Sequence, residues 1–332
     1  MSTDTRSIDE VLTRLNNRQR IRRILTVVGI VAVIAVTWIG MGFLGFQYDD
    51  LARQLPTFIQ SLTEFLSPDF VDFTGYSREN EITGWAGLYE SLLRPGELLS
   101  SLVAQEGIVG VSVVTIVIGF TGTVLGFPLA LLFGVLGSER VTPFPFNFIF
   151  RGTMSTIRAV PALVWILIFI PLSGISPVSA MLAVATDTIG NLGRLFTDEL
   201  EEIDEGPIEA IRSTGASSSQ IVSFGMLSQV SSSFIAWTLY ILEINTRIAI
   251  SLGVVGAGGI GQYINLRIDL FAYSRAAAGL LMVVFIVLTV ELTSSRLRAR
   301  LRPEEDSDTS LVDAIKSLGD MNKWLGTNAG KK

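Results

Sequence analysis

The segment GPIEAIRSTGASSSQIVSFGMLSQV, residues 206–230, is the most informative stretch of this chain. It is polar and compatible with a helix, and it lies between two long apolar runs. Gly206-Pro207 can open a helix, because proline is tolerated in the first turn. Glu209 falls in the same turn, where the helix dipole favours a carboxylate. We therefore predict a short helix that lies outside the bilayer between two apolar segments.

Two small residues follow this predicted helix. Gly215 and Ala216 permit a bend and leave room for another protein surface to approach closely. A short helix of this kind can fill a groove on a partner protein. The competing interpretation is an ordinary amphipathic loop without a partner.

Hydrophobic residues make up 49% of the 332 residues, and charged residues only 17%. The apolar residues form unbroken runs instead of the periodic pattern of a soluble core, which indicates spans in a lipid bilayer. We predict an all-α, polytopic membrane protein with about six transmembrane helices. The predicted spans are residues 24–46, 108–136, 161–172, 178–196, 233–255 and 276–292. The first run is too long for the apolar part of a typical cleaved signal peptide.

Arginine residues flank the first and the last predicted spans. The first span is preceded by Arg14, Arg18, Arg20, Arg22 and Arg23, and the last is followed by Arg296, Arg298, Arg300 and Arg302. Because positive charge collects on the cytoplasmic side of a membrane, both termini are expected there. The acid-rich segment 47–105 then faces outside, and the segment 206–230 faces the cytoplasm.

This topology divides the chain into five parts. They are a cytoplasmic N-terminal arm with an amphipathic helix (1–23), the first transmembrane helix (24–46), an extracytoplasmic segment with amphipathic helices (47–105), a membrane core (106–300) with a cytoplasmic loop (197–230), and a cytoplasmic tail (301–332). Apolar residues between Leu51 and Leu66 recur at helical spacing. The same spacing between Leu311 and Trp324 would allow a short helix in the tail, although a frayed surface tail is the favoured interpretation.

The composition disfavours several classes of function. The chain has no His and no Cys, so the commonest general base, the commonest metal ligand and any thiolate site are missing. It has no Walker A sequence G-x-x-x-x-G-K-[ST], so ATP hydrolysis is not expected from this chain. We expect no cofactor, no metal ion and no nucleic-acid partner. The net charge of −6 fits either a halophilic source or ordinary compositional drift.

Five strings in the second half of the chain are informative together: IRAVPALVW (157–165), DTIGNLGRLF (187–196), EEIDEGPIEAIRSTGAS (201–217), LEINTRIA (242–249) and LGVVGAGGIG (252–261). With these strings, the chain from Thr156 onward resembles the permease subunits of phosphonate-type ABC importers. The third string contains Glu209-Ala210 followed by Gly215 six residues after the glutamate. This is the EAA pattern, which is typical of importer permeases with the type I fold. The string LEINTRIA, followed by VGAGGIG, narrows the resemblance to the branch for phosphonate, phosphite or phosphate.

The resemblance implies a set of partners. Two copies of an ABC ATPase subunit would bind the loop from the cytoplasm, and an extracytoplasmic substrate-binding protein would deliver the solute. A second permease copy, or a related chain, would complete the pore in the lipid bilayer of the cell membrane. The coupling loop would comprise Gly206, Pro207, Glu209, Ala210, Gly215, Ala216 and Leu227. The family usually has proline after this leucine, whereas this chain has Ser228, which leaves the exit angle of the helix open.

Polar residues inside the predicted spans are candidate sites. Asp187 lies in the fourth span, and Glu243, Asn245 and Arg247 lie in the fifth. Intramembrane charges usually face a cavity or a partner, because exposing them to lipid is costly. Glu243 and Arg247 can pair across one helical turn. Two interpretations stay open: an ion pair that fixes helix packing, or a translocation pathway in which Arg247 contacts a passing anion. The role of Asp187 is undetermined, because the family often has histidine there.

Two further motifs lie at predicted span ends. The string GAGGIG fits G-x-G-x-x-G, but no acidic residue follows at the spacing of a dinucleotide site and an apolar run precedes it. We predict a tight turn or hinge near the outer pore mouth, formed by Gly256, Gly258, Gly259 and Gly261. Arg158 and Pro161 mark the predicted cytoplasmic start of the third span, where Arg158 would reach the interface or take part in gating.

Together these features predict the transmembrane permease subunit of an ATP-driven importer for phosphonate or a related phosphorus oxyanion, with no enzymatic activity of its own. The alternative is a type I permease for another small solute, such as methionine or glycine betaine, against which the string LEINTR argues. Neither the identity of the oxyanion nor the choice between a homodimeric and a heterodimeric pore follows from this chain.

Overall fold

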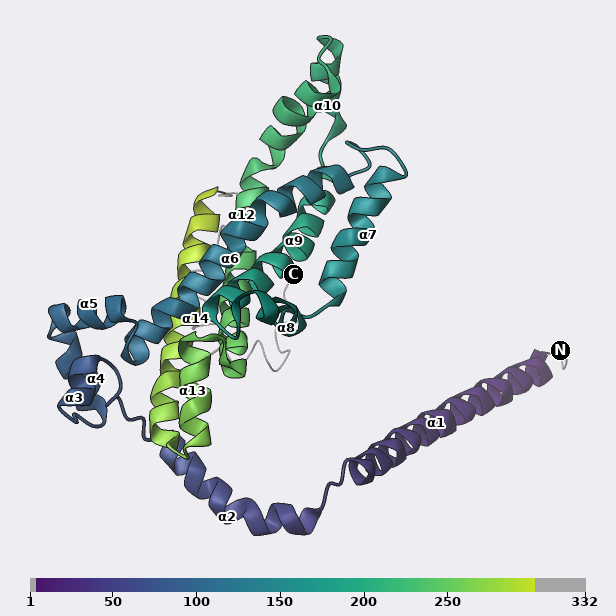
Figure 1. The fold of residues 1–332 in the computed structure, drawn as a ribbon. Helices are drawn as coiled ribbons and strands as arrows, with labels where there is room; N and C mark the ends of the chain where they lie inside the picture. Colours follow the sequence, from purple (N-terminus) through teal and green to yellow (C-terminus); the bar gives the residue numbers. More distant parts are fainter. Residues whose placement is uncertain (1–3, 302–332) are drawn as a thin grey trace, which may run out of the picture. The chain divides into compact units, whose positions relative to one another are not determined.

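The computed structural model describes residues 4–301, with side chains from residue 18 onward, and every regular element in that range is helical (Figure 1). The predicted helix between Leu311 and Trp324 lies outside the described residues. The chain divides into two units, one up to Thr63 and one from Glu64 onward, which are described separately.

The first unit holds two helices, α1 (Asp4–Phe43) and most of α2 (Tyr48–Phe65). α1 runs without a break across residue 23, where an arm was expected to meet the first span. No proline or glycine lies between residues 4 and 28 to interrupt the helix. Its apolar part, Arg18–Phe43, is long enough to cross a membrane and is not buried. Near its end, the ring of Trp38 stacks on that of Tyr48, the first residue of α2. α2 has the expected apolar face, and Leu51, Leu55, Phe58, Ile59 and Leu62 on it are all exposed.

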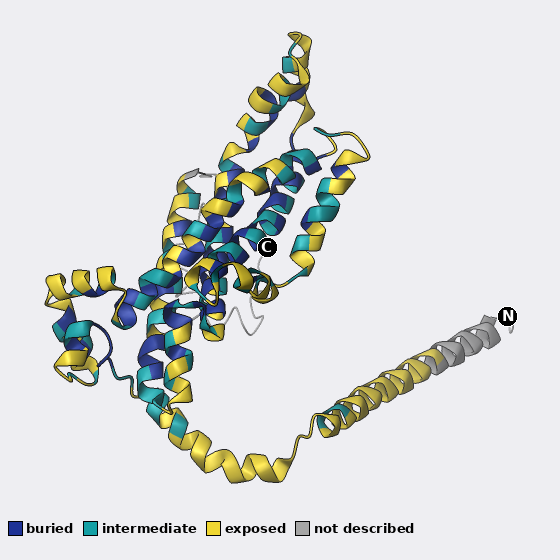
Figure 2. Cartoon of the chain, in the orientation of Figure 1, coloured by how far each residue is buried: buried dark blue, intermediate teal, exposed yellow. Residues whose placement is uncertain are grey.

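The core of the second unit is built from α6 (Gly107–Gly137), α9 (Pro177–Glu201), α12 (Leu227–Leu252) and α14 (Tyr273–Leu301). α6 and α9 pack closely because glycines line the contact. A Cβ atom on Gly122 would lie 2.6 Å from Val184 Cγ1, and one on Gly126 would lie 2.5 Å from the carbonyl oxygen of Ala185. The most heavily buried residues lie along this helix pair and α12 (Figure 2).

The number of spans differs from the predicted six. Within residues 4–301, four helical segments are long and apolar enough to cross a membrane: Arg18–Phe43, Gly107–Gly137, Ser218–Ala257 and Tyr273–Arg300. The predicted third span is the second half of a bent pair, α7 (Phe146–Ala159) and α8 (Ala162–Ser173), with an angle of 91° between its halves. If this bent pair crosses the membrane as one span, the number of candidate spans is five.

The predicted fourth span is α9, which has 25 residues but is not among the four segments that are long and apolar enough to cross a membrane. It packs against α6, α7, α8 and α12, so much of its surface faces protein instead of lipid. A helix surrounded in this way can carry polar residues along its length, because hydrogen bonds to its neighbours satisfy them.

Three short helices precede α6: α3 (Gly75–Glu79), α4 (Trp85–Leu92) and α5 (Pro95–Ala104). They are tied to α13 (Gly259–Asp269) through the buried carboxylate of Asp72. Asp72 lies 2.9 Å from an Arg267 guanidinium nitrogen and accepts a hydrogen bond from the Tyr263 hydroxyl at 3.1 Å. Burial, together with the charge of Asp72, raises the pKa of the Tyr263 phenol. The segment before α6 is therefore a folded part of the second unit.

Candidate functional site

The segment between α9 and α12 projects from one end of the helical core (Figure 1). It contains α10 (Glu205–Ser213), α11 (Ser218–Gln220) and a π-helix, η1 (Ile221–Met226). Pro207 lies in the first turn of α10, as predicted. Gly215 follows the helix with a φ of 82°, a left-handed conformation that glycine adopts without strain. The predicted helix and bend are confirmed.

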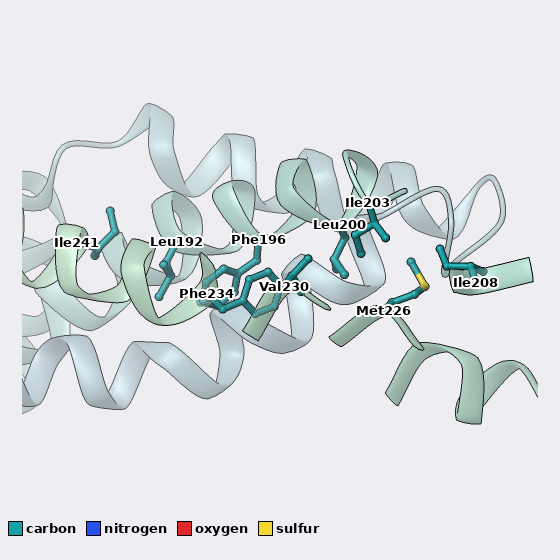
Figure 3. Close-up of a cluster of buried hydrophobic side chains, with 10 residues drawn as sticks. Leu192, Phe196, Leu200, Ile203, Ile208, Met226, Val230, Phe234 and Ile241 are labelled. Carbon is teal, nitrogen blue, oxygen red and sulfur yellow. The ribbon is translucent and has the colours of Figure 1, made fainter. Parts of the chain in front are cut away.

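One face of α10 is anchored, and the other is exposed. Ile208 is 7% exposed and belongs to a cluster that also holds Ile203, Leu200 and Met226 (Figure 3). The cluster continues along α9 and α12, where the rings of Phe196 and Phe234 stack with their centres 4.0 Å apart.

The exposed face carries the motif residues. Gly206, Pro207, Glu209 and Ala210 are exposed, while Ala216 and Leu227 are half-buried. A cavity of about 280 Å³ beside Ile208 is lined by charged groups that include Glu209, Arg140 and Arg212. The loop is therefore held at its base and presents its motif to solvent.

Serine at position 228 does not break the helix. The helix continues from Ser218 through η1 and α12 into a second π-helix, η2 (Gly253–Ala257), and departs from helical geometry only at Gly256, which has a φ of 95°. The Ser228 hydroxyl donates a hydrogen bond to the carbonyl oxygen of Phe224. The loop consequently leaves through an unbroken helix.

The predicted Glu243–Arg247 pair forms and is part of a cluster of four charges. The Glu243 side chain is 10% exposed and lies 2.7 Å from an Arg247 nitrogen. Arg298 of α14 lies 3.6 Å from the same carboxylate. Arg247 is 49% exposed and also lies 3.4 Å from Glu291. Two positive and two negative charges thus lie together between α12 and α14, which supports the ion-pair interpretation, while a contact of Arg247 with a passing anion stays a prediction.

Asn245 lies in the interior between three helices. It is fully buried and donates hydrogen bonds to the hydroxyl groups of Thr123 in α6 and Thr188 in α9, both at 2.8 Å. Its position between α6, α9 and α12 supports a role in helix packing.

Asp187 and Arg158 are brought together through Asn191. The Asn191 amide donates to Asp187 Oδ2 at 2.8 Å, and Arg158 Nε donates to Asn191 Oδ1 at 3.2 Å. Arg158 is exposed and lies at the end of α7, and Pro161 begins the turn into α8. Both residues therefore mark the break inside a bent helix pair, whereas the sequence predicted the start of a span.

The glycine string forms the predicted turn. Gly256 near the end of η2, Gly258 between the two elements and Gly259 at the start of α13 (Gly259–Asp269) have φ values of 95°, 95° and 74°. At Gly261 a Cβ atom would lie 2.0 Å from the carbonyl oxygen of Ile250, so only glycine fits. The turn borders a cavity of about 500 Å³ that is also lined by Gln262 and Asn265. The structure thus supplies a hinge-like turn with helices on both sides.

Sequence reasoning missed the groups that hold the loop at its base. Arg151 of α7 forms an ion pair with Glu201 at the end of α9. Arg140 Nη1 donates to the carbonyl oxygen of Ile203 at 2.6 Å. No spacing pattern predicts these contacts, because the partners lie 50 and 63 residues apart in the sequence.

Comparison with known protein families identifies the family to which this chain belongs. Residues 122–304, just over half of the chain, match the family described as binding-protein-dependent transport system inner membrane component. The chain belongs to this family. It is accordingly a multi-pass membrane protein, and the matched region contains both the projecting loop and the intramembrane polar groups.

Two curated relatives are named for phosphorus oxyanions. The putative phosphite transport system permease protein HtxC of Stutzerimonas stutzeri is 33% identical over 53% of this chain and 61% of its own length. The phosphate-import permease protein PhnE of Mycolicibacterium smegmatis is 33% identical over 56% of this chain and 35% of its own length. The matches therefore span less than two thirds of both relatives. A D-methionine permease of Vibrio cholerae is more distant, at 25% identity.

The fold matches that of a solved importer. A chain of the MetNI methionine ABC transporter in an inward-facing conformation aligns with a TM-score of 0.51 at 23% identity, over 61% of this chain and 96% of that one. The part of the chain that aligns thus has the type I importer permease fold.

Proposed function

We propose that this protein is the transmembrane permease subunit of an ATP-binding cassette importer for phosphonate, phosphite or phosphate. The observation that carries the proposal is the loop between α9 and α12, which is held at its base by Ile208 and exposes Glu209 and Ala210. A short helix with one anchored and one exposed face is suited to filling a groove on a second protein. The relatives named for phosphite and phosphate import support the solute class.

The proposed partners follow from this function. Two ATPase subunits bind α10 from the cytoplasm, a binding protein delivers the solute from the other side, and a second permease chain completes the pathway. The exposed apolar surface of the membrane helices faces lipid or this second chain. The proposed pathway borders the glycine turn after η2 and the break between α7 and α8, where Arg158 is exposed.

The test is reconstitution. The chain should co-purify with an ABC ATPase, and vesicles with the complete importer should take up radiolabelled phosphite, phosphate or methylphosphonate when ATP is supplied. An excess of methionine or glycine betaine should not compete. Uptake of methionine or glycine betaine in place of the phosphorus compounds would establish the alternative solute class. Absence of any ATPase from the purified complex would contradict the importer itself.

The proposed topology places both termini and α10 in the cytoplasm and residues 47–105 outside. Single cysteines can test it, because the chain has none. Ser100→Cys should react with an impermeant maleimide in sealed right-side-out vesicles, because Ser100 is exposed. Ser219→Cys, exposed near α10, should react only after permeabilisation. Ser77→Cys is the control for burial, since Ser77 is fully buried and should stay unlabelled in both states. The reverse pattern for Ser100 and Ser219 would overturn this orientation.

A further inference from the structure

Two arginines fasten the base of the projecting loop to α7 and to the end of α6. Arg151 lies in the middle of α7, and its Nε donates to the carbonyl oxygen of Gly137, the last residue of α6, at 2.7 Å. The same guanidinium forms the ion pair with Glu201, the last residue of α9. One side chain therefore joins the middle of α7 to the ends of α6 and α9, and its planar guanidinium is suited to two acceptors at once.

A second arginine, Arg140, adds a contact closer to α10. We call the contacts of Arg140 and Arg151 at the base of the loop the arginine joint. Arg140 follows α6 and donates to the carbonyl oxygen of Ile203, in the link between α9 and α10. The backbone N–H of Glu139 donates to Glu201 Oε1 at 3.2 Å. The three-residue link between α9 and α10 is thus held from the α6–α7 side by both arginines, while Ile203 and Ile208 hold it through apolar contacts.

The arginine joint couples movement of α10 to movement of α7. α7 leads directly to the 91° break before α8, and the exposed Arg158 lies at that break. A force applied to α10 reaches α9 through the covalent chain. It reaches α7 through the Arg151–Glu201 contact, because the short link leaves little freedom between them. Packed elements joined by charged hydrogen bonds move together instead of deforming separately.

We propose that Arg151 and Arg140 are positioning residues that transmit movement of the loop to α7, and thereby to the break between α7 and α8. The inference rests on the proposed importer function and names the residues that connect its ATPase-binding loop to the pathway. Neither residue is proposed to touch the solute or ATP.

The test compares Arg151→Gln with a matched control in the purified complex with its ATPase and binding protein. Arg194→Gln is the control, because Arg194 forms an ion pair with Asp198 at 2.9 Å that lies within α9 alone and joins no second element. The readouts are ATP hydrolysed per phosphite taken up, and the distance between spin labels at Ser155 of α7 and Ser100 of α5. The distance is measured with and without trapped nucleotide.

For Arg151→Gln, ATP hydrolysis should persist, while the ATP consumed per solute should rise by roughly fivefold or more, the lower end of typical coupling between sites. The nucleotide-dependent change in the label distance should shrink in the same variant. Arg194→Gln should leave both readouts as in the wild type. Glu201→Gln removes the same ion pair from the other side and provides the second variant if Arg151→Gln does not fold.

Wild-type coupling and an unchanged label response in Arg151→Gln would overturn the inference and leave the importer function intact. If the wild-type complex itself lacks ATP-driven uptake, the proposed function fails instead. The two failures are therefore distinguishable.

Discussion

Replacing Gly215 with aspartate is expected to abolish ATP-driven uptake while the protein remains folded in the membrane. Gly215 has a left-handed backbone, and a Cβ atom there meets nothing within 4 Å in this chain. Apart from the backbone strain of a non-glycine residue at a φ of 82°, which asparagine and aspartate tolerate better than most residues, a steric obstacle to the new side chain would come from a docked partner. Disrupting the centre of an interface typically costs about 2 kcal/mol or more, which weakens binding roughly 30-fold.

Uptake in vesicles and co-purification of the ATPase are the measurements for this variant. Gly215→Asn is the isosteric, uncharged comparison, and asparagine also tolerates a left-handed backbone. Loss of uptake in both variants would indicate that the size of the new side chain prevents docking. Loss of uptake in Gly215→Asp alone would indicate that its negative charge prevents docking. Gly96→Asp is the control, because Gly96 in α5 also has open space around its Cβ position. Wild-type uptake by Gly215→Asp would remove this loop from the coupling mechanism.

Removing the carboxylate of Glu243 is expected to be the most destabilising change in the intramembrane charge cluster. Glu243 holds Arg247 and Arg298 together and is 10% exposed on its side chain. Breaking a buried pair by deleting one partner costs about 3–5 kcal/mol. Because Arg247 keeps Glu291 as a second partner, the loss for Glu243→Gln should lie near the lower end. The measurement is the thermal unfolding temperature in detergent, with the expression level.

Arg247→Gln should be milder, about 1 kcal/mol, because the group is half exposed and Glu243 keeps Arg298. The double variant should lose less than the sum of the two single variants, because the Glu243–Arg247 contact is counted in both single losses but is removed only once. Glu106→Gln is the control for a surface pair, because Arg78 and Glu106 are about half exposed and their removal should leave the unfolding temperature unchanged.

Transport by the double variant separates the two interpretations of Arg247. The four charges offset one another, so we expect the folded double variant to take up solute at a rate close to that of the wild type. Loss of uptake in a double variant with normal expression and unfolding temperature would instead assign Arg247 to the translocation pathway.

The sequence determined those features that depend on neighbouring residues. Pro207 and Gly215 set the start and the end of the exposed helix through local backbone preferences. The four-residue spacing of Glu243 and Arg247 placed both on one face. The glycines from Gly256 onward predicted a turn, because a glycine residue can adopt positive φ wherever it lies in a chain.

Only the tertiary structure decided features that depend on which helices meet. α9 was predicted as a span, yet its position among four helices removes the need for an apolar surface. Asn245 forms a hydrogen bond with Thr123, which lies 122 residues away in the sequence, and Arg151 contacts Glu201, which lies 50 residues away. Hydrogen bonds of this kind have no period along the chain, because their geometry is fixed by packing. The hydrophobic pattern thus specifies that the chain enters a membrane, whereas packing between helices selects the polar groups that connect the loop to the core.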